Sequence, residues 1–133
     1  MTPHRHDRWL IDGNNVMGAR PDGWWRDRAG AAARLTDGVD AWQQQTGHDV
    51  VLVFDGPDRR ELTGRSRPGF EVRFAERAGR NAGDDLVVRL AAERGDDDQP
   101  DTVVTSDAGL VARLPEAADV VGSGAFRKML ENR

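Results

Sequence analysis

Short apolar segments alternate along the chain with longer segments in which apolar residues recur at helical spacing. The short segments predict strands, and "VVLVF" is apolar on both faces, which is typical of a parallel strand covered by helices on both sides. The longer segments predict helices, the first ending at the C-cap Gly47 and the last beginning at the N-cap Ser123. The predicted strands are residues 8–11, 50–54, 70–74, 101–107 and 118–122, and the predicted helices are residues 25–46, 84–95, 108–114 and 123–133.

This alternation predicts an α/β fold in which helices cover both faces of a central, mainly parallel, five-stranded sheet. The length of 133 residues and the absence of internal repeats suit a single domain, 1–133. In such three-layer, Rossmann-like α/β/α domains, ligands gather beyond the carboxyl ends of the strands, where the strand order reverses. Functional residues are therefore expected directly after the strands.

The composition is that of a soluble globular protein, with 38% apolar and 32% charged residues. No apolar stretch approaches the roughly 18 residues of a membrane span, so no membrane partner is expected. The chain has no cysteine, which excludes disulfides and thiolate metal sites. A cytoplasmic location is the resulting expectation.

The net charge of −4 does not favour nucleic-acid binding, but the charge is unevenly distributed. Residues 57–82 contain seven arginines against four acidic residues. Such a basic segment is either a solvated loop or a surface that holds the phosphates of RNA. The arginines expected to contact RNA are Arg59, Arg60, Arg65, Arg67 and Arg80.

Aspartates follow three of the predicted strands, at Asp12, Asp55 and Asp107. Parallel strands bring their carboxyl ends to one edge of the sheet, and neighbouring strands are only about 4.8 Å apart. Asp84 and Asp85 begin the helix that leads into the fourth strand, so the first turn of that helix is expected near the same edge. The sequence therefore predicts a cluster of carboxylates.

Clustered carboxylates repel one another unless a cation or bound protons neutralise them. Hard oxygen ligands suit Mg²⁺ or Mn²⁺, and either ion makes a bound water more nucleophilic while neutralising charge on a phosphate. Beside a basic segment, this pattern favours hydrolysis of phosphodiester bonds. The residues expected to hold the metal and carry catalysis are Asp12, Asp55, Asp84 and Asp107.

Each of these residues also has a purely structural interpretation. Asp12 could be a turn residue, and Asp85 could simply complement the helix dipole. Asn15 could be a turn former, or it could orient Asp12 or a water on the metal. Ser106 could be an ordinary polar residue at a strand end, or it could support a metal ligand through a hydrogen bond.

The segments "LIDGNNVMG", "VVLVFDG", "NAGDDLVV" and "VVTSD", in this order, resemble the NYN-domain family of PIN-like nucleases, particularly its YacP-like branch. The ending "VVGSGAFRKML" also resembles that branch, so the resemblance covers nearly the whole chain. It implies a PIN-like α/β/α fold with a strand order of roughly 3-2-1-4-5, and metal-dependent endoribonuclease activity from an acidic cluster. Gly83 departs from the family pattern, which often has alanine there. The residues that match the family's acidic positions and its asparagine are Asp12, Asp55, Asp84, Asp107 and Asn15.

The leading expectation is thus an endoribonuclease that uses Mg²⁺ or Mn²⁺ to cut single-stranded RNA. An RNA-binding module of the same family without turnover is a second possibility. A receiver-like phosphate-transfer domain also gathers aspartates at strand ends, but it would need a lysine on the last strand. The only lysine, Lys128, falls in the last predicted helix, which disfavours a receiver.

Overall fold

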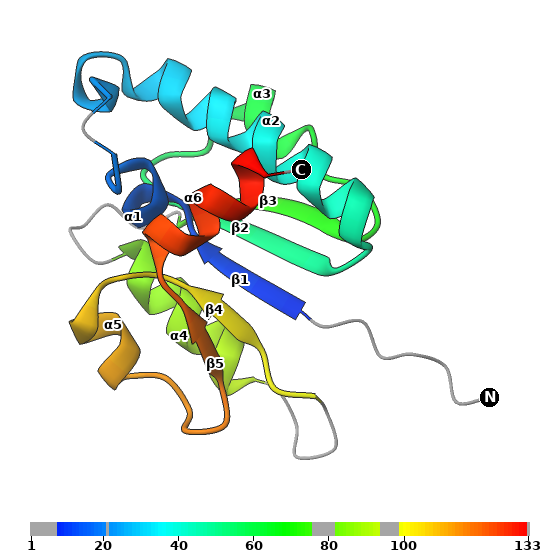
Figure 1. Ribbon diagram of the computed structural model, residues 1–133, viewed down its shortest axis with the longest axis vertical. Helices are drawn as coiled ribbons and strands as arrows, with labels where there is room; N and C mark the ends of the chain where they lie inside the picture. Colours follow the sequence, from blue (N-terminus) through cyan, green and yellow to red (C-terminus); the bar gives the residue numbers. More distant parts are fainter. Residues whose placement is uncertain (1–7, 21, 76–81, 94–98, 133) are drawn as a thin grey trace.

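The computed structural model describes residues 8–20, 22–75, 82–93 and 99–132, and its centre is a five-stranded sheet (Figure 1). The strands are β1 (Arg8–Asp12), β2 (Asp49–Asp55), β3 (Phe70–Ala75), β4 (Thr102–Val104) and β5 (Asp119–Val121). They lie in the order β3-β2-β1-β4-β5, and each neighbouring pair is parallel. The predicted parallel sheet and the strand order implied by the resemblance are both confirmed.

Helices cover both faces of this sheet and complete three layers (Figure 1). They are α1 (Gly13–Met17), the 3₁₀ helix η1 (Trp24–Arg26), α2 (Arg28–Thr46), α3 (Arg60–Thr63), α4 (Ala82–Ala92), α5 (Ala108–Ala112) and α6 (Ser123–Glu131). Apolar side chains of α1, α2, α3 and α6 form a core with one face of the sheet. Those of α4 and α5 form a second core with the other face.

Alternation along the central strand decides which side chain enters which core. Leu10 pairs in register with Val51 and Val103, and all three belong to the core beneath α4. Trp9 faces the opposite core, where its ring meets Trp42 edge-on with 4.9 Å between the ring centroids. β1 is buried on both faces, and Asp12 is its last residue, so the position of Asp12 is fixed by a well-packed strand.

The helix predicted over residues 25–46 begins later than expected. Its first residues form η1, and α2 starts after Asp27, whose carboxylate accepts a 3.0 Å hydrogen bond from the backbone N–H of Gly30. This is an ordinary N-cap arrangement. At the other end of α2, Gly47 adopts a left-handed conformation with φ of 73°, as predicted for a glycine C-cap.

Two further details of local structure differ from what the sequence suggested. The segment Gly13–Met17, in which Asn15 could have been a turn former, is the short helix α1. Ser123 does not cap α6, because Gly122 is the N-cap and Ser123 is the first helical residue. A loop is expected from the sequence over residues 75–83, but Ala75 is the last residue of β3, and Ala82 and Gly83 begin α4. Residues 76–81 of this loop lie outside the described residues.

The strand order turns at β1, which has β2 and β3 on one side and β4 and β5 on the other. A switch point therefore lies at the carboxyl ends of β1 and β4, where ligands bind in sheets of this type. Among the described helices, none has the length and apolar character needed to cross a membrane.

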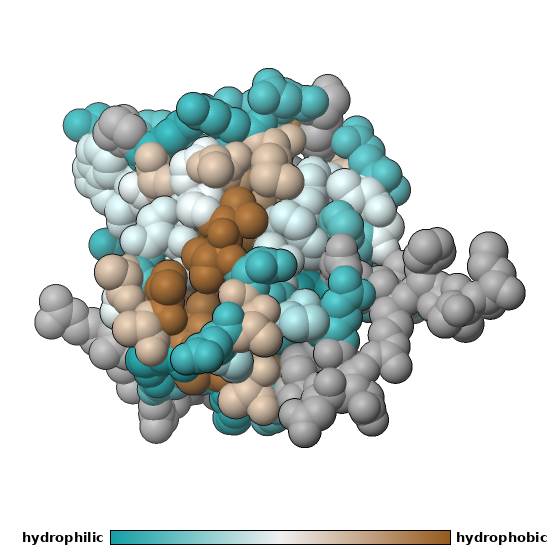
Figure 2. Space-filling view, turned by 60° about the horizontal axis from the view of Figure 1, so that its bottom comes forward, coloured by the Kyte–Doolittle hydropathy of each residue, from teal (hydrophilic) through white to brown (hydrophobic). Residues whose placement is uncertain are grey.

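The β5 edge of the sheet carries exposed apolar surface. Figure 2 turns this end of the molecule forward and shows apolar side chains gathered in one strip between polar ones. Val120 of β5 is 43% exposed. In the described sheet, β5 pairs with β4 alone.

Candidate active site at the carboxyl edge of the sheet

Asp12 is the most deeply buried of the predicted site residues, with 7% of its surface exposed. The hydroxyl of Thr105 donates a 3.0 Å hydrogen bond to Oδ2 of Asp12, and the backbone N–H of Asn15 also bonds to the carboxylate. Burial outweighs these bonds and raises the pKa of Asp12 to about 6. Repulsion by Asp84 and Asp55 acts in the same direction. Asp12 is therefore a carboxylate held in a site that disfavours its own negative charge.

Asp55 and Asp84 meet where the end of β2 touches the start of α4. The backbone N–H of Gly83 donates a 2.7 Å hydrogen bond to Oδ1 of Asp55. Burial raises the pKa of Asp55, and burial together with repulsion by Asp107 and Asp55 raises the pKa of Asp84. These mutual effects place Asp12, Asp55, Asp84 and Asp107 in one electrostatic cluster, as the sequence predicted from their strand ends.

Asp107 has a structural role as well. Its Oδ1 accepts hydrogen bonds from the backbone N–H groups of Gly109 (2.8 Å) and Leu110 (3.2 Å), so it caps α5. Its own backbone N–H donates to the hydroxyl of Thr105 at 3.1 Å. Thr105 thus connects Asp107 to Asp12, although its sequence position gave it only the character of a strand-end polar residue.

Asn15 bridges elements rather than pointing its oxygen at Asp12. Its Oδ1 accepts a 2.8 Å hydrogen bond from the backbone N–H of Ser106 and another from the hydroxyl of Ser123. The hydroxyl of Ser106 in turn accepts a 2.8 Å bond from the backbone N–H of Ser123. This network joins α1 to the segment after β4 and to the start of α6, and it fixes Asn15 beside the cluster.

Asn14 is a positioning residue that sequence reasoning missed. Its Oδ1 accepts a 2.7 Å hydrogen bond from the backbone N–H of Asp55. The asparagine pair at the start of α1 therefore reaches two different strands, Asn14 toward β2 and Asn15 toward β4. In the sequence, both residues have only the signature of turn formers.

Asp85 lies beside the cluster but is engaged elsewhere. Its carboxylate forms a 2.6 Å ion pair with Arg113, and the two side chains are 37% and 45% exposed. Asp85 is thus distinguished from its neighbour Asp84, whose pKa responds mainly to burial and to the other clustered carboxylates.

The arginines predicted to bind RNA separate into groups. Arg65 and Arg67 pair with acidic residues of α2, including a 3.0 Å contact from Arg65 to Asp40. Arg67 also pairs by its backbone with Phe70, at the beginning of β3. In a parallel sheet this is the amino edge, so the expectation that Arg65 and Arg67 stand beside the acidic edge is wrong.

The remaining predicted arginines follow β2 or lie outside the described chain. Arg59 forms a 3.0 Å hydrogen bond with Glu61, and Arg60 is the exposed first residue of α3. Both come after the carboxyl end of β2. Arg80 lies outside the described residues.

The donor chemistry of the cluster fits Mg²⁺ or Mn²⁺, because all four side chains offer hard oxygen ligands. Among the described residues, no group of three or more Asp, Glu, His or Cys side chains is spaced to hold one metal ion directly. Magnesium keeps several waters and commonly takes only one or two carboxylates, so the cluster suits an ion held partly through water. Asp12, Asp55, Asp84 and Asp107 are the residues that would surround it.

Comparison with known proteins adds to this geometry. A family model described as the YacP-like NYN domain matches residues 9–132. The chain belongs to this family. Two solved structures of Rae1 (YacP) from Bacillus subtilis, the second of a point mutant, are each 24% identical to the chain. The first has a TM-score of 0.72 and the match covers 95% of this chain and 74% of that one; for the mutant the values are 0.70, 95% and 76%.

No curated protein matches the chain. The likeness to the two Rae1 structures shows the fold, and membership in the YacP-like NYN family indicates a nuclease-type function. In this YacP-like NYN domain the acidic cluster lies at the switch point of the sheet, where such a function would be carried out.

Proposed function

We propose that this YacP-like NYN domain is a metal-dependent endoribonuclease that hydrolyses phosphodiester bonds in single-stranded RNA. The observation that carries the proposal is the electrostatic coupling of Asp12, Asp55 and Asp84, and of Asp84 with Asp107, at the carboxyl edge of the sheet. Such coupled, partly buried carboxylates are costly to the fold and typical of functional sites.

The side chains around the cluster hold the carboxylates in fixed orientations. Thr105 fixes Asp12, the backbone N–H of Gly83 fixes Asp55, and the two cap bonds fix Asp107. A bound Mg²⁺ or Mn²⁺ would supply charge neutralisation at the scissile phosphate and activation of water. The four carboxylates would hold that ion at the carboxyl edge of the sheet, and their fixed orientations would favour one position for it.

The test is cleavage of a labelled single-stranded RNA with Mn²⁺, with Mg²⁺ and with EDTA. We expect cleavage with either ion and none in EDTA, and we expect Asp12→Asn to abolish it. The matched control is Asp119→Asn. Asp119 is exposed and is the first residue of β5, so it lies at the amino edge of the sheet, away from the carboxylate cluster. Undiminished cleavage in EDTA, or equal loss in the Asp119 variant, would contradict the proposal.

A second candidate is an RNA-binding module without turnover. It is favoured by the cap bonds that occupy Oδ1 of Asp107 and by the spacing of the carboxylates, which gives no direct three-ligand site among the described residues. This alternative predicts RNA binding that is the same with Mn²⁺ and with EDTA, and no cleavage in either.

A further inference from the structure

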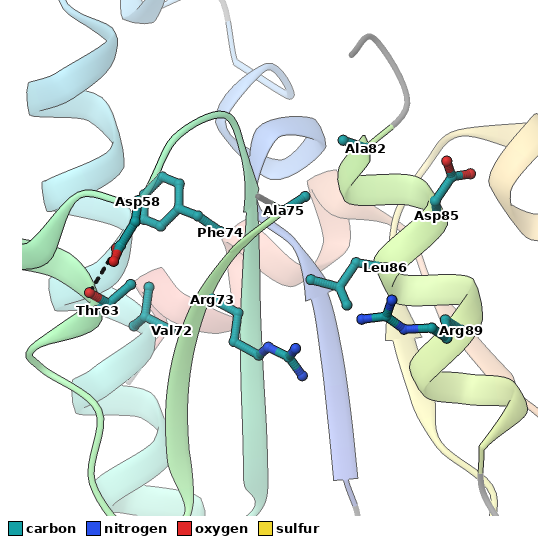
Figure 3. A pocket seen from close by; sticks show the side chains of 10 residues that line it. All are labelled: Asp58, Thr63, Val72, Arg73, Phe74, Ala75, Ala82, Asp85, Leu86 and Arg89. Atoms are coloured by element: carbon teal, nitrogen blue, oxygen red, sulfur yellow. Dashed lines mark hydrogen bonds between the residues drawn. The ribbon is translucent and has the colours of Figure 1, made fainter. Parts of the chain in front are cut away.

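A groove of about 710 Å³ lies between the edge strand β3 and helix α4 (Figure 3). Alternation along β3 turns Arg73 and Ala75 toward α4, while Val72 faces the other core. From the opposite wall, Leu86 and Arg89 of α4 line the same space. The groove therefore has one arginine on each wall and apolar side chains between them. Around the edge of β3 it is also lined by Val72, Phe74, Thr63 and Asp58, and the hydroxyl of Thr63 donates a 2.9 Å hydrogen bond to Asp58.

One end of this groove lies at the carboxyl edge of the sheet, beside the carboxylate cluster. Ala75, the last residue of β3, pairs in register with Asp55, and Ala82 of the groove wall directly precedes Gly83, which bonds to Asp55. Arg73 is two residues below the end of β3, which corresponds to about 7 Å along the strand. Arg89 is five residues beyond Asp84, which corresponds to about 7.5 Å along the helix. Both arginines thus lie roughly 7 Å from the carboxyl edge of the sheet, measured along their own elements.

Neither groove arginine forms a hydrogen-bonded ion pair with an acidic residue of the described chain. Among the described residues, Arg73 forms no ion pair, and the nearest acid to Arg89 is Glu93 at 3.8 Å, too far for a hydrogen bond. Asp85 also lines the groove, but its charge is paired with Arg113. Figure 3 shows the guanidinium groups of Arg73 and Arg89 extending into the space between β3 and α4.

Guanidinium groups bind phosphate oxygens through two parallel hydrogen bonds, and positive grooves that follow the backbone are how single strands are held. We propose that the β3–α4 groove binds the phosphodiester backbone of an RNA strand on one side of the acidic cluster, with Arg73 and Arg89 contacting phosphate from opposite walls. This proposal rests on the proposed function, since it assigns the path of the substrate of that site. In this proposal, Arg73 and Arg89 are the main phosphate contacts in place of Arg65 and Arg67, which lie at the amino edge of the sheet.

The test is binding of a fluorescent single-stranded oligoribonucleotide of about 12 nucleotides, measured by anisotropy in EDTA so that no cleavage is needed. We expect Arg73→Gln and Arg89→Gln each to weaken binding about three- to tenfold. Each lost contact should also lower the slope of log affinity against log salt by about 0.7. The matched control is Lys128→Gln on α6, which removes one exposed positive charge from the other face of the sheet.

Unchanged affinity in the double variant, with an unchanged melting temperature, would overturn the proposal. An equal loss in Lys128→Gln would also overturn it, because it would show a general charge effect rather than a groove. If adenosine monophosphate binds with the same dependence on Arg73 and Arg89 while the oligonucleotide does not, the groove is a mononucleotide pocket and the strand proposal is wrong. Cleavage by the wild type is measured separately: its absence removes the nuclease proposal, whereas these binding results decide the groove.

Discussion

The backbone N–H of Gly83 donates a 2.7 Å hydrogen bond to the carboxylate of Asp55, so the first turn of α4 is held directly against the end of β2. A Cβ atom at position 83 would lie only 2.2 Å from Oδ1 of Asp55. In this chain glycine leaves room for the Asp55 carboxylate in its present orientation, and the alanine that the family often has at this position would require that carboxylate to turn. This contact brings Asp84 to the acidic edge, although α4 lies 28 residues beyond Asp55 in the chain.

Gly83→Ala should damage the site even though alanine is the better helix former. The added methyl group overlaps the Asp55 carboxylate, so either Asp55 must turn away or α4 must move. We expect destabilisation of about 1–3 kcal/mol in urea unfolding and a loss of cleavage. The control is Gly124→Ala in α6, where a Cβ would meet nothing within 4 Å and where a gain of about 0.5–1 kcal/mol is expected. Equal behaviour of the two variants would contradict the steric explanation.

The raised pKa of Asp12 predicts how stability depends on pH in the absence of metal. The folded pKa is about 6 and the unfolded value is 3.8, so between these values the folded state binds more protons than the unfolded state. Stability should therefore fall as pH rises from about 4 to about 7. Replacement of Asp12 by asparagine should remove this part of the fall, amounting to as much as about 3 kcal/mol at pH 7.

Urea unfolding of the wild type and of Asp12→Asn at several pH values in EDTA measures this difference. The two proteins should be similar at pH 4 and should diverge as pH rises, with the variant more stable. Asp119→Asn, which removes an exposed aspartate at the other edge, should follow the wild type. A variant that is less stable than the wild type at pH 7 would show that Asp12 is a turn residue whose carboxylate supports the fold.

The acidic cluster could be predicted from sequence because its placement depends on local facts. Asp12 and Asp55 directly follow apolar runs, and Asp107 follows one after two polar residues; parallel strands bring such positions to one edge. The supporting residues could not be predicted, because their roles depend on contacts made only in the folded chain. Asn14 bonds to a residue 41 positions away, and nothing in its neighbourhood distinguishes it from a turn former.

The misplacement of Arg65 and Arg67 has a related cause. A count of charges within a segment shows that it is basic, but not which acids it will meet. Arg65 pairs with Asp40, 25 residues earlier in the chain, because the turn before β3 packs against α2. Arg73 was a single arginine among seven in the sequence, and only the pairing of β3 with β2 shows that it faces α4.

Divalent metal should stabilise the fold. A cation that binds the folded state and not the unfolded one adds about 2.7 kcal/mol when its concentration is a hundredfold above its dissociation constant. For a domain near this size, we expect Mn²⁺ to raise the melting temperature by several degrees, at about 2–8 °C per kcal/mol. Asp12→Asn should show a smaller rise, since it lacks one ligand, whereas Asp119→Asn should match the wild type. Scanning fluorimetry with and without Mn²⁺ measures all three, and an equal rise in all three would place the ion elsewhere.

The last prediction concerns the ion pairs between α2 and the turn before β3. Burial alone would raise the pKa of Asp40, but hydrogen bonds from Gln44, Arg67 and Arg65 lower it below its ordinary value. The stabilisation from Asp40 is therefore present above its unfolded pKa and is lost as pH falls through the lower folded value.

Replacing Arg65 and Arg67 together with glutamine should destabilise the protein at pH 7 by about 1 kcal/mol, and by less near pH 3, where Asp40 is partly neutralised in both states. The same double variant should bind single-stranded RNA in EDTA with an affinity much closer to wild type than the double variant of Arg73 and Arg89. Chemical unfolding at the two pH values and anisotropy on the same samples measure both effects. If Asp40 is the main partner of these two arginines, their removal must lower the stability of the fold before it affects RNA binding. A large loss of RNA affinity with no loss of stability would therefore show that Arg65 and Arg67 contact the nucleic acid instead.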